Sequence, residues 1–310
     1  MRRRRAPAYG TDCSDVSWWA FGFWRTREWV PGLTREIRAA NEKNPSGIYI
    51  GDAEHRPPWL TGMRAPVSAP AVSRPQVILS PAQPRVVGSF GNVESLAGTT
   101  YQQALAACDL LEIRLDLLET PETRPWAHLS GLPMLFTARR GDEGGRGDLS
   151  AARRSALLEA VLDEASLIDA ELSSAGEMSD LLAEAARRGV PWVASWHDFE
   201  GIGPDALLMI LRKAEEAAEA GAACFKAAIR LNGMEDLCWL GGLMAQRTEL
   251  TPLPIALMGM GPLAPVSRLL CAQYGSVLNY GYIGDAPTAP GQWSAALLKG
   301  ALGASQINII

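Results

Sequence analysis

One lysine stands out among the side chains that could do covalent chemistry. The chain has four lysines and twenty-five arginines, and Lys226 is the lysine that lies in an apolar stretch, residues 222–229, typical of a buried strand. Burying an ammonium group is costly unless it is paired or neutralised, and desolvation lowers the pKa of a lysine. A neutral amine can attack a carbonyl carbon, and an arginine cannot. The position indicates an amine nucleophile; a salt-bridged or snorkelling lysine is the alternative.

A histidine at the end of the preceding apolar run could act as the base. The ordinary pKa of histidine lies near neutrality, so His197 could both take and return a proton. Such a pair suits removal of a proton from the carbon next to a carbonyl, because a protonated imine accepts the electrons better than a ketone does. His55 lies in a separate N-terminal stretch, and His128, next to a turn, is expected at the surface or in a cap.

Short apolar runs alternate with helical patterns from residue 84 onward. The predicted strands are 86–90, 110–116, 132–138, 167–172, 192–197, 224–229, 254–259 and 276–280. The predicted helices are 94–108, 121–129, 150–164, 178–188, 204–220, 233–247, 264–274 and 291–302. Eight such repeats predict an α/β fold of the (β/α)8 TIM barrel type. A doubly wound open sheet is the alternative, disfavoured because no GxGxxG motif follows the first strand and no Walker lysine occurs.

The polar residues of these strands fall on one face. Alternate strand residues of a barrel point inward, and active sites form at the C-terminal ends of the strands. The predicted inward set is Glu112, Arg114 and Asp116, Thr137 and Arg139, Asp169 and Glu171, Ser195 and His197, Cys224, Lys226 and Ala228, and Met258 and Met260. One inward charge could be a structural ion pair. Polar or charged residues on several strands together predict a titratable pocket.

Six fragments in this order resemble type I 3-dehydroquinate dehydratase, the Schiff-base dehydratase of the shikimate pathway. They are LEIRLD (111–116), FTAR (136–139) with EGG (143–145), SWHDF (195–199), FKAA (225–228), MGM (258–260) with SRL (267–269), and TAPGQ (288–292). The resemblance extends from about residue 84 to the C-terminus. It implies dehydration of 3-dehydroquinate to 3-dehydroshikimate without a metal or an organic cofactor.

The resemblance also implies a role for each matched residue. Lys226 would form an imine with the C3 ketone, His197 would move the protons, and Glu143 would orient or polarise His197. Arg268 would bind the substrate carboxylate. The ring hydroxyls would be held by Glu112, Arg114, Arg139 and Gln292, with Ser89 assisting, while Asp116 anchors an arginine and Met258 and Met260 form an apolar wall. Thr288 stands in the expected lid, residues 282–292, where the family usually has serine.

Residues 1–83 are predicted to be a separate extension and linker. They carry twelve basic and seven acidic side chains, in a chain of net charge −5, and residues 64–84 are rich in proline, serine and alanine. We expect a poorly ordered segment, or translation from an upstream start with Met63 as the true one; a small tryptophan-bearing docking segment is the alternative. Residues 77–79 could be a remnant of the hairpin that plugs the barrel in this family.

The composition restricts compartment and partners. Five widely spaced cysteines without a CxxC motif predict a reduced, cytoplasmic protein. No apolar run approaches the ~20 residues that span a membrane, and the net charge gives no attraction to nucleic acid. The resemblance implies a homodimer acting on a small molecule. Two other functions stay open, a different Schiff-base barrel such as a class I aldolase, and a non-catalytic binding or scaffold protein.

Overall fold

Eight parallel strands form the centre of the protein. The computed structural model describes residues 74–201, 206–285, 287–289 and 291–305. The strands are β1 (Arg85–Phe90), β2 (Leu110–Arg114), β3 (Met134–Thr137), β4 (Leu167–Glu171), β5 (Trp192–Asp198), β6 (Cys224–Arg230), β7 (Ile255–Met260) and β8 (Leu278–Ile283). They follow the order β7-β6-β5-β4-β3-β2-β1-β8, so the last strand pairs with the first. The predicted (β/α)8 barrel is confirmed, and a doubly wound order is excluded.

Ser276 bridges the seam between β7 and β8. The main chain crosses this seam through a hydrogen bond from the N–H of Val277 to the carbonyl of Ile255, at 3.0 Å. The fully buried hydroxyl of Ser276 accepts from the N–H of Leu257 at 3.1 Å and lies 3.4 Å from its carbonyl oxygen. A side chain thus supplies contacts that a strand ladder makes elsewhere, and the barrel is nearly closed.

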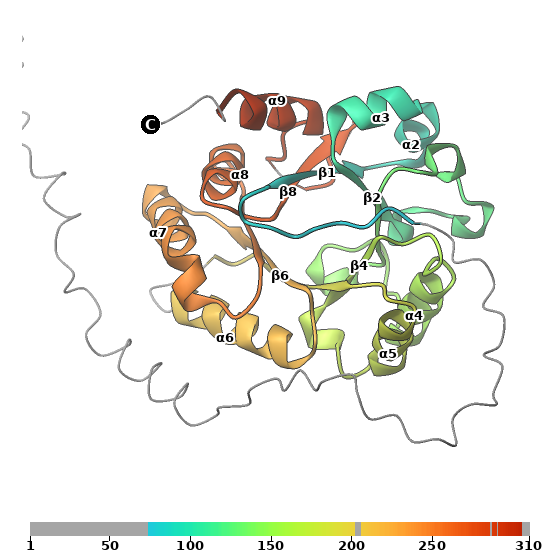
Figure 1. The fold of residues 1–310 in the computed structure, drawn as a ribbon, viewed down its shortest axis with the longest axis horizontal. Coiled ribbons are helices and arrows are strands. Elements are labelled where there is room, and N and C mark those ends of the chain that lie inside the picture. The colour runs from blue at the N-terminus through green and yellow to red at the C-terminus, as the bar shows by residue number, and fades with distance from the viewer. Residues whose placement is uncertain (1–73, 202–205, 286, 290, 306–310) are drawn as a thin grey trace, which may run out of the picture. The chain divides into compact units, whose positions relative to one another are not determined.

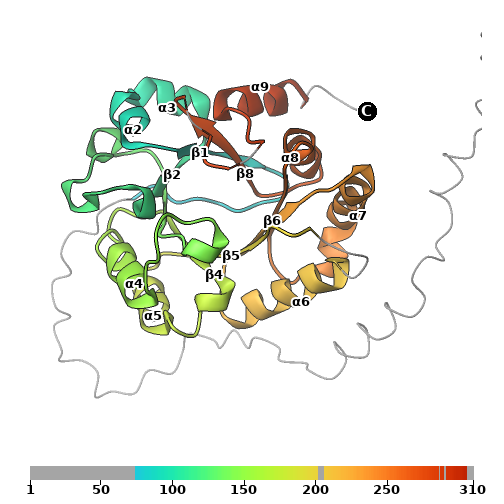
Figure 2. The same ribbon diagram turned by 180° about the vertical axis from the view of Figure 1, so that it is seen from behind.

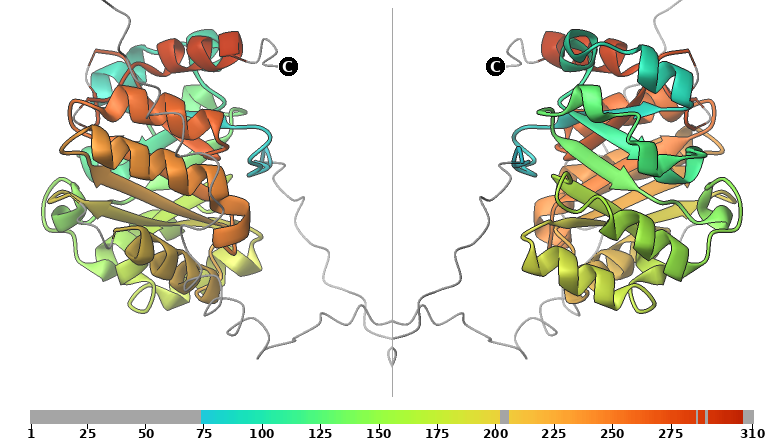
Figure 3. Two further views of the ribbon diagram at one scale, coloured as in Figure 1. Left: turned by 90° about the vertical axis from the view of Figure 1, so that its left-hand side faces the viewer. Right: turned by 90° about the vertical axis from the view of Figure 1, so that its right-hand side faces the viewer.

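Helices surround the strands, as Figures 1 and 2 show from opposite ends and Figure 3 shows from two sides. They are α2 (Val93–Gly98), α3 (Tyr101–Ala107), α4 (Ala151–Glu159), α5 (Ser179–Arg187), α6 (Ala206–Glu219), α7 (Met234–Leu250), α8 (Ala264–Gln273) and α9 (Ala295–Ser305). In the described part of the chain, no helix has the length and hydropathy to cross a membrane.

Local capping explains two differences from the predicted helices. The single helix expected over 94–108 is two, because Thr100 and Gln103 form a capping box that starts a second helix. The helix expected over 121–129 consists of two 3₁₀ turns, Pro121–Thr123 and Ala127–Leu129.

The second and third strands end earlier than predicted. β2 stops at Arg114, and Asp116 lies in the 3₁₀ turn Leu115–Leu117 that follows. The turn lets the Asp116 carboxylate accept from the main-chain N–H groups of Arg139 and Arg146, both at 3.2 Å. β3 stops at Thr137, so Arg139 lies in the loop beyond it. The inward i, i+2 alternation therefore holds for Glu112 and Arg114 but not for Asp116.

The residues just before β1 contact the barrel. Val77 and Leu79 pack against the inner cluster that Val87, Leu110 and neighbouring strand residues form, and this segment, in cyan, crosses one end of the barrel in Figure 1. Arg74 donates to the carbonyl oxygen of Leu162 at 3.3 Å. Residues 74–83, which the sequence assigned to the extension, thus cover one end of the lumen, whereas residues 1–73 lie outside the described chain.

The seam gives a test of barrel closure. Ser276→Ala leaves the N–H of Leu257 without its hydroxyl partner in a fully buried place, so we expect the free energy of unfolding to fall by about 1–3 kcal/mol. Urea denaturation measures this change. Ser130→Ala, at an exposed position, is the control and should leave stability nearly unchanged. Equal stability of the two variants would show that Ser276 does not hold the seam.

Candidate active site

A cavity of about 140 Å³ lies at the C-terminal ends of the strands. Eleven of the thirteen predicted site residues line it: Lys226, His197, Glu143, Glu112, Arg114, Arg139, Arg268, Thr288, Gln292, Met258 and Met260. Ser89 and Asp116 are the two that do not. Gly144, Phe199, Ala228, Tyr280 and Ala289 complete the lining. The structure thus brings together residues that are up to 180 positions apart, from Glu112 to Gln292.

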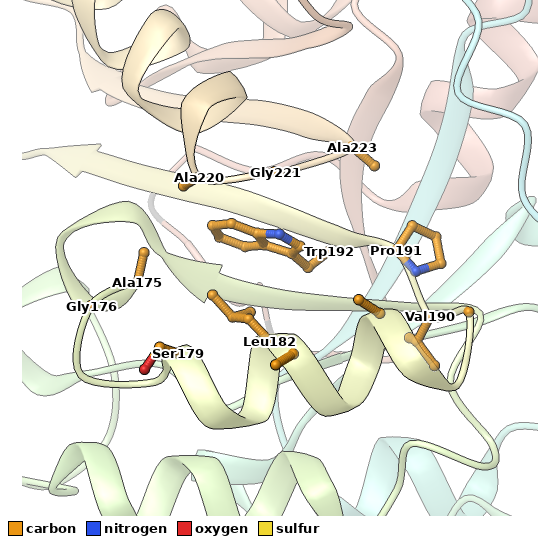
Figure 4. Close-up of a pocket in the computed structure, with 13 residues that line it drawn as sticks. Ala175, Gly176, Ser179, Leu182, Val190, Pro191, Trp192, Ala220, Gly221 and Ala223 are labelled. Atoms are coloured by element: carbon orange, nitrogen blue, oxygen red, sulfur yellow. The ribbon is translucent and has the colours of Figure 1, made fainter. Parts of the chain in front are cut away.

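A larger hollow, of about 760 Å³, differs from this cavity in its lining. It is bordered by α5, by the end of α6 and by the start of β5, and its centre is the indole of Trp192 (Figure 4). Its thirteen lining residues include no acidic, basic, histidine or cysteine side chain. Volume alone would favour this groove, but it has no acid or base and none that could activate the hydroxyl of Ser179, so the barrel cavity is the candidate active site.

Lys226 lies on β6 and is buried, with 4% of its surface exposed. Its Nζ donates to Oδ2 of Asp169 at 2.9 Å and lies 4.3 Å from the centroid of the Tyr280 ring. A carboxylate and an aromatic face both favour a cation at this place. The predicted buried lysine is confirmed, and two side chains hold its amine at the cavity wall.

Arg139 holds the other oxygen of Asp169. Its Nη2 donates to Oδ1 of Asp169 at 2.7 Å, and its Nη1 donates to Oε1 of Glu171 at 3.0 Å and to the hydroxyl of Ser195. Burial alone would raise the pKa of Asp169, but the charges of Arg139 and Lys226 outweigh it and hold the pKa well below its ordinary value. Asp169 therefore stays ionised and is a shared counterion for both cations.

The charge network continues outward to a helix. Arg154, on α4 and only 2% exposed, donates from Nη1 to Oε2 of Glu171 and from Nη2 to the hydroxyl of Ser174 at 2.9 Å. Asp169, Glu171 and Ser195 were predicted to point inward, but were not assigned to the site. The sequence pattern did not indicate Arg154 as part of the network, because it follows the exposed Arg153 in an ordinary helical pattern.

His197 and Glu143 form a second pair at the cavity. Oε2 of Glu143 lies 3.0 Å from Nδ1 of His197 and accepts from the N–H of the same residue at 3.1 Å. An oxygen that already accepts from the main chain favours a proton on Nδ1, which leaves Nε2 with the free lone pair. Burial raises the pKa of Glu143 to about 7. Burial, with the charges of Arg139 and Lys226, lowers the pKa of His197 well below its ordinary value.

Two hydroxyl groups hold the carboxylate of Glu112. Its Oε1 accepts from the Thr137 hydroxyl at 2.9 Å, and its other oxygen accepts from the hydroxyl of Ser89. Ser89 is fully buried and does not line the cavity, so it lies beneath the site and supports Glu112. The expected part of Ser89 in ligand binding stays a prediction, and the contact that the structure shows is the one with Glu112.

Arg114 is fixed by Asp116. The guanidinium donates from Nε and Nη2 to the two oxygens of Asp116, at 2.8 and 2.6 Å. Burial opposes the charge of Asp116, but the hydrogen bonds and the charge of Arg114 prevail and lower its pKa. Asp116 thus anchors an arginine from outside the cavity, as the resemblance implied.

Arg268 is a buried cation available to an anion. It is 2% exposed, and its Nη1 donates to the carbonyl oxygen of Tyr280 at 3.1 Å. Burial lowers its pKa to about 10. Its Nε has no hydrogen-bond partner among the described residues, and none of their carboxylates pairs with it. Nearby, Thr288 donates from its N–H and hydroxyl to Oε1 of Gln292, at 2.9 and 2.7 Å.

The chain is similar to known proteins. The model of the type I 3-dehydroquinase family matches residues 91–309. A 3-dehydroquinate dehydratase from Methanothrix thermoacetophila is 33% identical over 221 residues, which cover 71% of this chain and 91% of the relative. The chain belongs to the type I 3-dehydroquinase family. It is therefore an enzyme, and the family places it in the shikimate pathway.

Two further proteins agree with this family. The 3-dehydroquinate dehydratase of Shouchella clausii is 33% identical over 208 residues, covering 63% of this chain and 80% of the relative. The crystal structure of 3-dehydroquinate dehydratase from Geobacillus kaustophilus has a TM-score of 0.63 and 24% identity, and covers 76% of this chain and 99% of that one. The structural likeness supports the barrel fold.

The Glu143 carboxyl makes stability depend on pH. Its pKa is about 7 in the folded protein and about 4.5 in an unfolded chain, so the folded state binds the proton more tightly. As pH rises from about 4.5 to 7, this group should cost up to about 3 kcal/mol of stability, a loss that Glu143→Gln removes. Urea denaturation across this range checks it, with the exposed Glu122→Gln as control. A constant difference between wild type and Glu143→Gln would contradict the raised pKa.

Proposed function

We propose that the enzyme dehydrates 3-dehydroquinate to 3-dehydroshikimate through a covalent imine on Lys226. The observation that supports this most is the buried amine of Lys226 on the cavity wall, next to Asp169 and one strand away from the His197–Glu143 pair. The registers of β5 and β6 place Ser195 beside Lys226 and His197 beside Ala228. A nucleophile and a base thus border the same small volume.

Imine formation uses the neutral amine of Lys226, which attacks the C3 carbonyl carbon of the substrate once its ammonium group has lost a proton. The carbonyl oxygen receives that proton and a second one from the nitrogen and leaves the carbinolamine as water, so the nitrogen carries the positive charge of a protonated imine. Asp169 accepts a hydrogen bond from Nζ and stays ionised, so it offsets the positive charge of the imine. The ring of Tyr280, 4.3 Å from Nζ, also favours that charge.

His197 moves the protons of the elimination. Its Nε2 takes a proton from C2, and the electron pair of the C–H bond passes into the imine to form an enamine. The enamine then expels the C1 hydroxyl, which leaves as water with the proton from His197, and the imine re-forms in conjugation with the new double bond. Water releases the product and frees Lys226. Glu143 fixes the imidazole in the tautomer that this sequence needs.

The remaining cavity residues bind the substrate. Arg268 is assigned to the carboxylate, because it is a buried cation without a carboxylate partner in the described chain. Glu112, Arg114 and Gln292 are assigned to the ring hydroxyls. The guanidinium of Arg139 is already engaged by three side chains, so we assign it chiefly to holding Asp169.

The loop after β8 is assigned to a lid. Thr288, Ala289 and Gln292 line the cavity, and the Thr288–Gln292 hydrogen bonds hold this part of the loop together. Closure over the cavity would keep water from the imine until the elimination is complete. A homodimer and a cytoplasmic location, both predicted from the sequence, stay predictions.

Reductive trapping tests the covalent step. Borohydride added with 3-dehydroquinate should leave the protein with a mass increase on the peptide that contains Lys226, and enzymatic activity should disappear with it. Lys226→Met should show neither the adduct nor turnover, because no amine remains to attack the ketone. Peptide mass spectrometry locates the adduct.

The controls separate this reaction from other Schiff-base chemistry. Lys213→Met removes a lysine that lies over the Trp196 ring, outside the cavity, and should be trapped normally. Dihydroxyacetone phosphate, the keto-phosphate of an aldolase, should give no adduct. Turnover that survives in Lys226→Met would exclude the imine mechanism.

Removal of the imidazole should separate imine formation from elimination. His197→Ala retains Lys226 and Asp169, so we expect it to accumulate the substrate imine while kcat falls by about 10²–10⁴-fold. Borohydride trapping of the resting mixture, followed by intact-protein mass spectrometry, measures the accumulated species. A variant with the kcat of the wild type would remove His197 from the proton path.

A further inference from the structure

Tyr280 lines the cavity, but the proposed mechanism uses only its aromatic ring and gives its hydroxyl no role. It lies on β8, is 4% exposed and lines the same cavity as Lys226. Its main chain pairs with Val87 of β1, and its carbonyl oxygen accepts from Nη1 of Arg268. The ring contacts the amine, with Nζ of Lys226 4.3 Å from its centroid. These contacts explain why an aromatic ring lies at this position.

The hydroxyl group needs a separate explanation. Among the described residues, the buried Tyr280 hydroxyl has no hydrogen-bond partner. A phenylalanine would supply the same ring face to Lys226 without burying a polar oxygen. Because burying an unsatisfied hydroxyl destabilises a fold, the free protein gains nothing from it. Tyr280 lines the active cavity, and a buried hydroxyl that lacks a partner among the described residues beside this cavity points to a ligand as its partner.

The surroundings of this hydroxyl make it a donor. Burial, followed by the negative charges of Glu112 and Asp169, raises the pKa of Tyr280 well above its ordinary value, so the phenol keeps its proton. Nε of Arg268 also lacks a partner among the described residues, and Arg268 borders the same cavity. Two unpartnered buried donors around one cavity suit an oxygen-rich anion, such as a hydroxylated ring carboxylic acid.

We propose that Tyr280 is a substrate-binding residue whose hydroxyl donates a hydrogen bond to an oxygen atom of the bound ring acid. The inference rests on the proposed function, since it takes 3-dehydroquinate as the ligand. The ring holds the amine of Lys226, and the hydroxyl binds the molecule that this amine attacks. Tyr280 thereby helps to position both the amine of Lys226 and the substrate that this amine attacks.

The variant Tyr280→Phe isolates the hydroxyl, because it keeps the ring. We compare wild type, Tyr280→Phe and Tyr274→Phe, where Tyr274 is an exposed residue after α8. The measurements are the melting temperature of the free protein and kcat and KM for 3-dehydroquinate. We expect Tyr280→Phe to melt no lower than wild type, with KM raised about tenfold and kcat within about twofold. Tyr274→Phe should keep both kinetic constants.

The outcomes are distinct. A Tyr280→Phe variant with the KM of wild type overturns the inference and leaves the proposed function intact. A lower melting temperature with a parallel loss of activity also overturns it, because the hydroxyl then has a structural partner such as a bound water. If none of the three proteins turns over 3-dehydroquinate, the proposed function fails, and this inference fails with it.

Discussion

The pairing of Lys226 with Asp169 is the contact on which the active site depends. A barrel interior excludes water, so an amine there needs a counterion, and a carboxylate there needs cations. Asp169 serves Lys226 with one oxygen and Arg139 with the other. Glu171 then holds Arg139, and Arg154 holds Glu171 from a helix. Removing one partner from such a chain leaves an unpaired buried charge, at a cost of about 3–5 kcal/mol.

Barrel topology makes this chain of charges possible. Parallel strands place all their carboxyl ends at one edge, and closure through β1–β8 and the Ser276 seam turns that edge into a ring. The base of β5 and the amine of β6 thereby border the same small cavity as Glu112 of β2, while Asp169 of β4 contacts the amine directly. The same closure buries Arg268 and Tyr280, each of which has one polar atom without a hydrogen-bond partner in the described part of the chain.

The sequence predicted what depends on local pattern and strand alternation. The eight strands, the buried Lys226 and the strand-end His197 could all be found in this way. The family resemblance added Glu143, Arg268, Thr288 and Gln292, which line the same cavity. It did not predict what depends on turns and distant pairing. Asp116 does not follow the strand alternation because it lies in a 3₁₀ turn. Ser89 is fully buried and does not line the cavity. Arg154 is indistinguishable by pattern from any helical arginine.

A crystal structure of the enzyme soaked with 3-dehydroquinate tests the central claim most directly. The account predicts continuous electron density from Nζ of Lys226 to a ring carbon, with Asp169 still within hydrogen-bond distance of that nitrogen and the substrate carboxylate against Arg268. A ring bound in the cavity of an active enzyme, with its ketone remote from Lys226 and the amine still free, would contradict it.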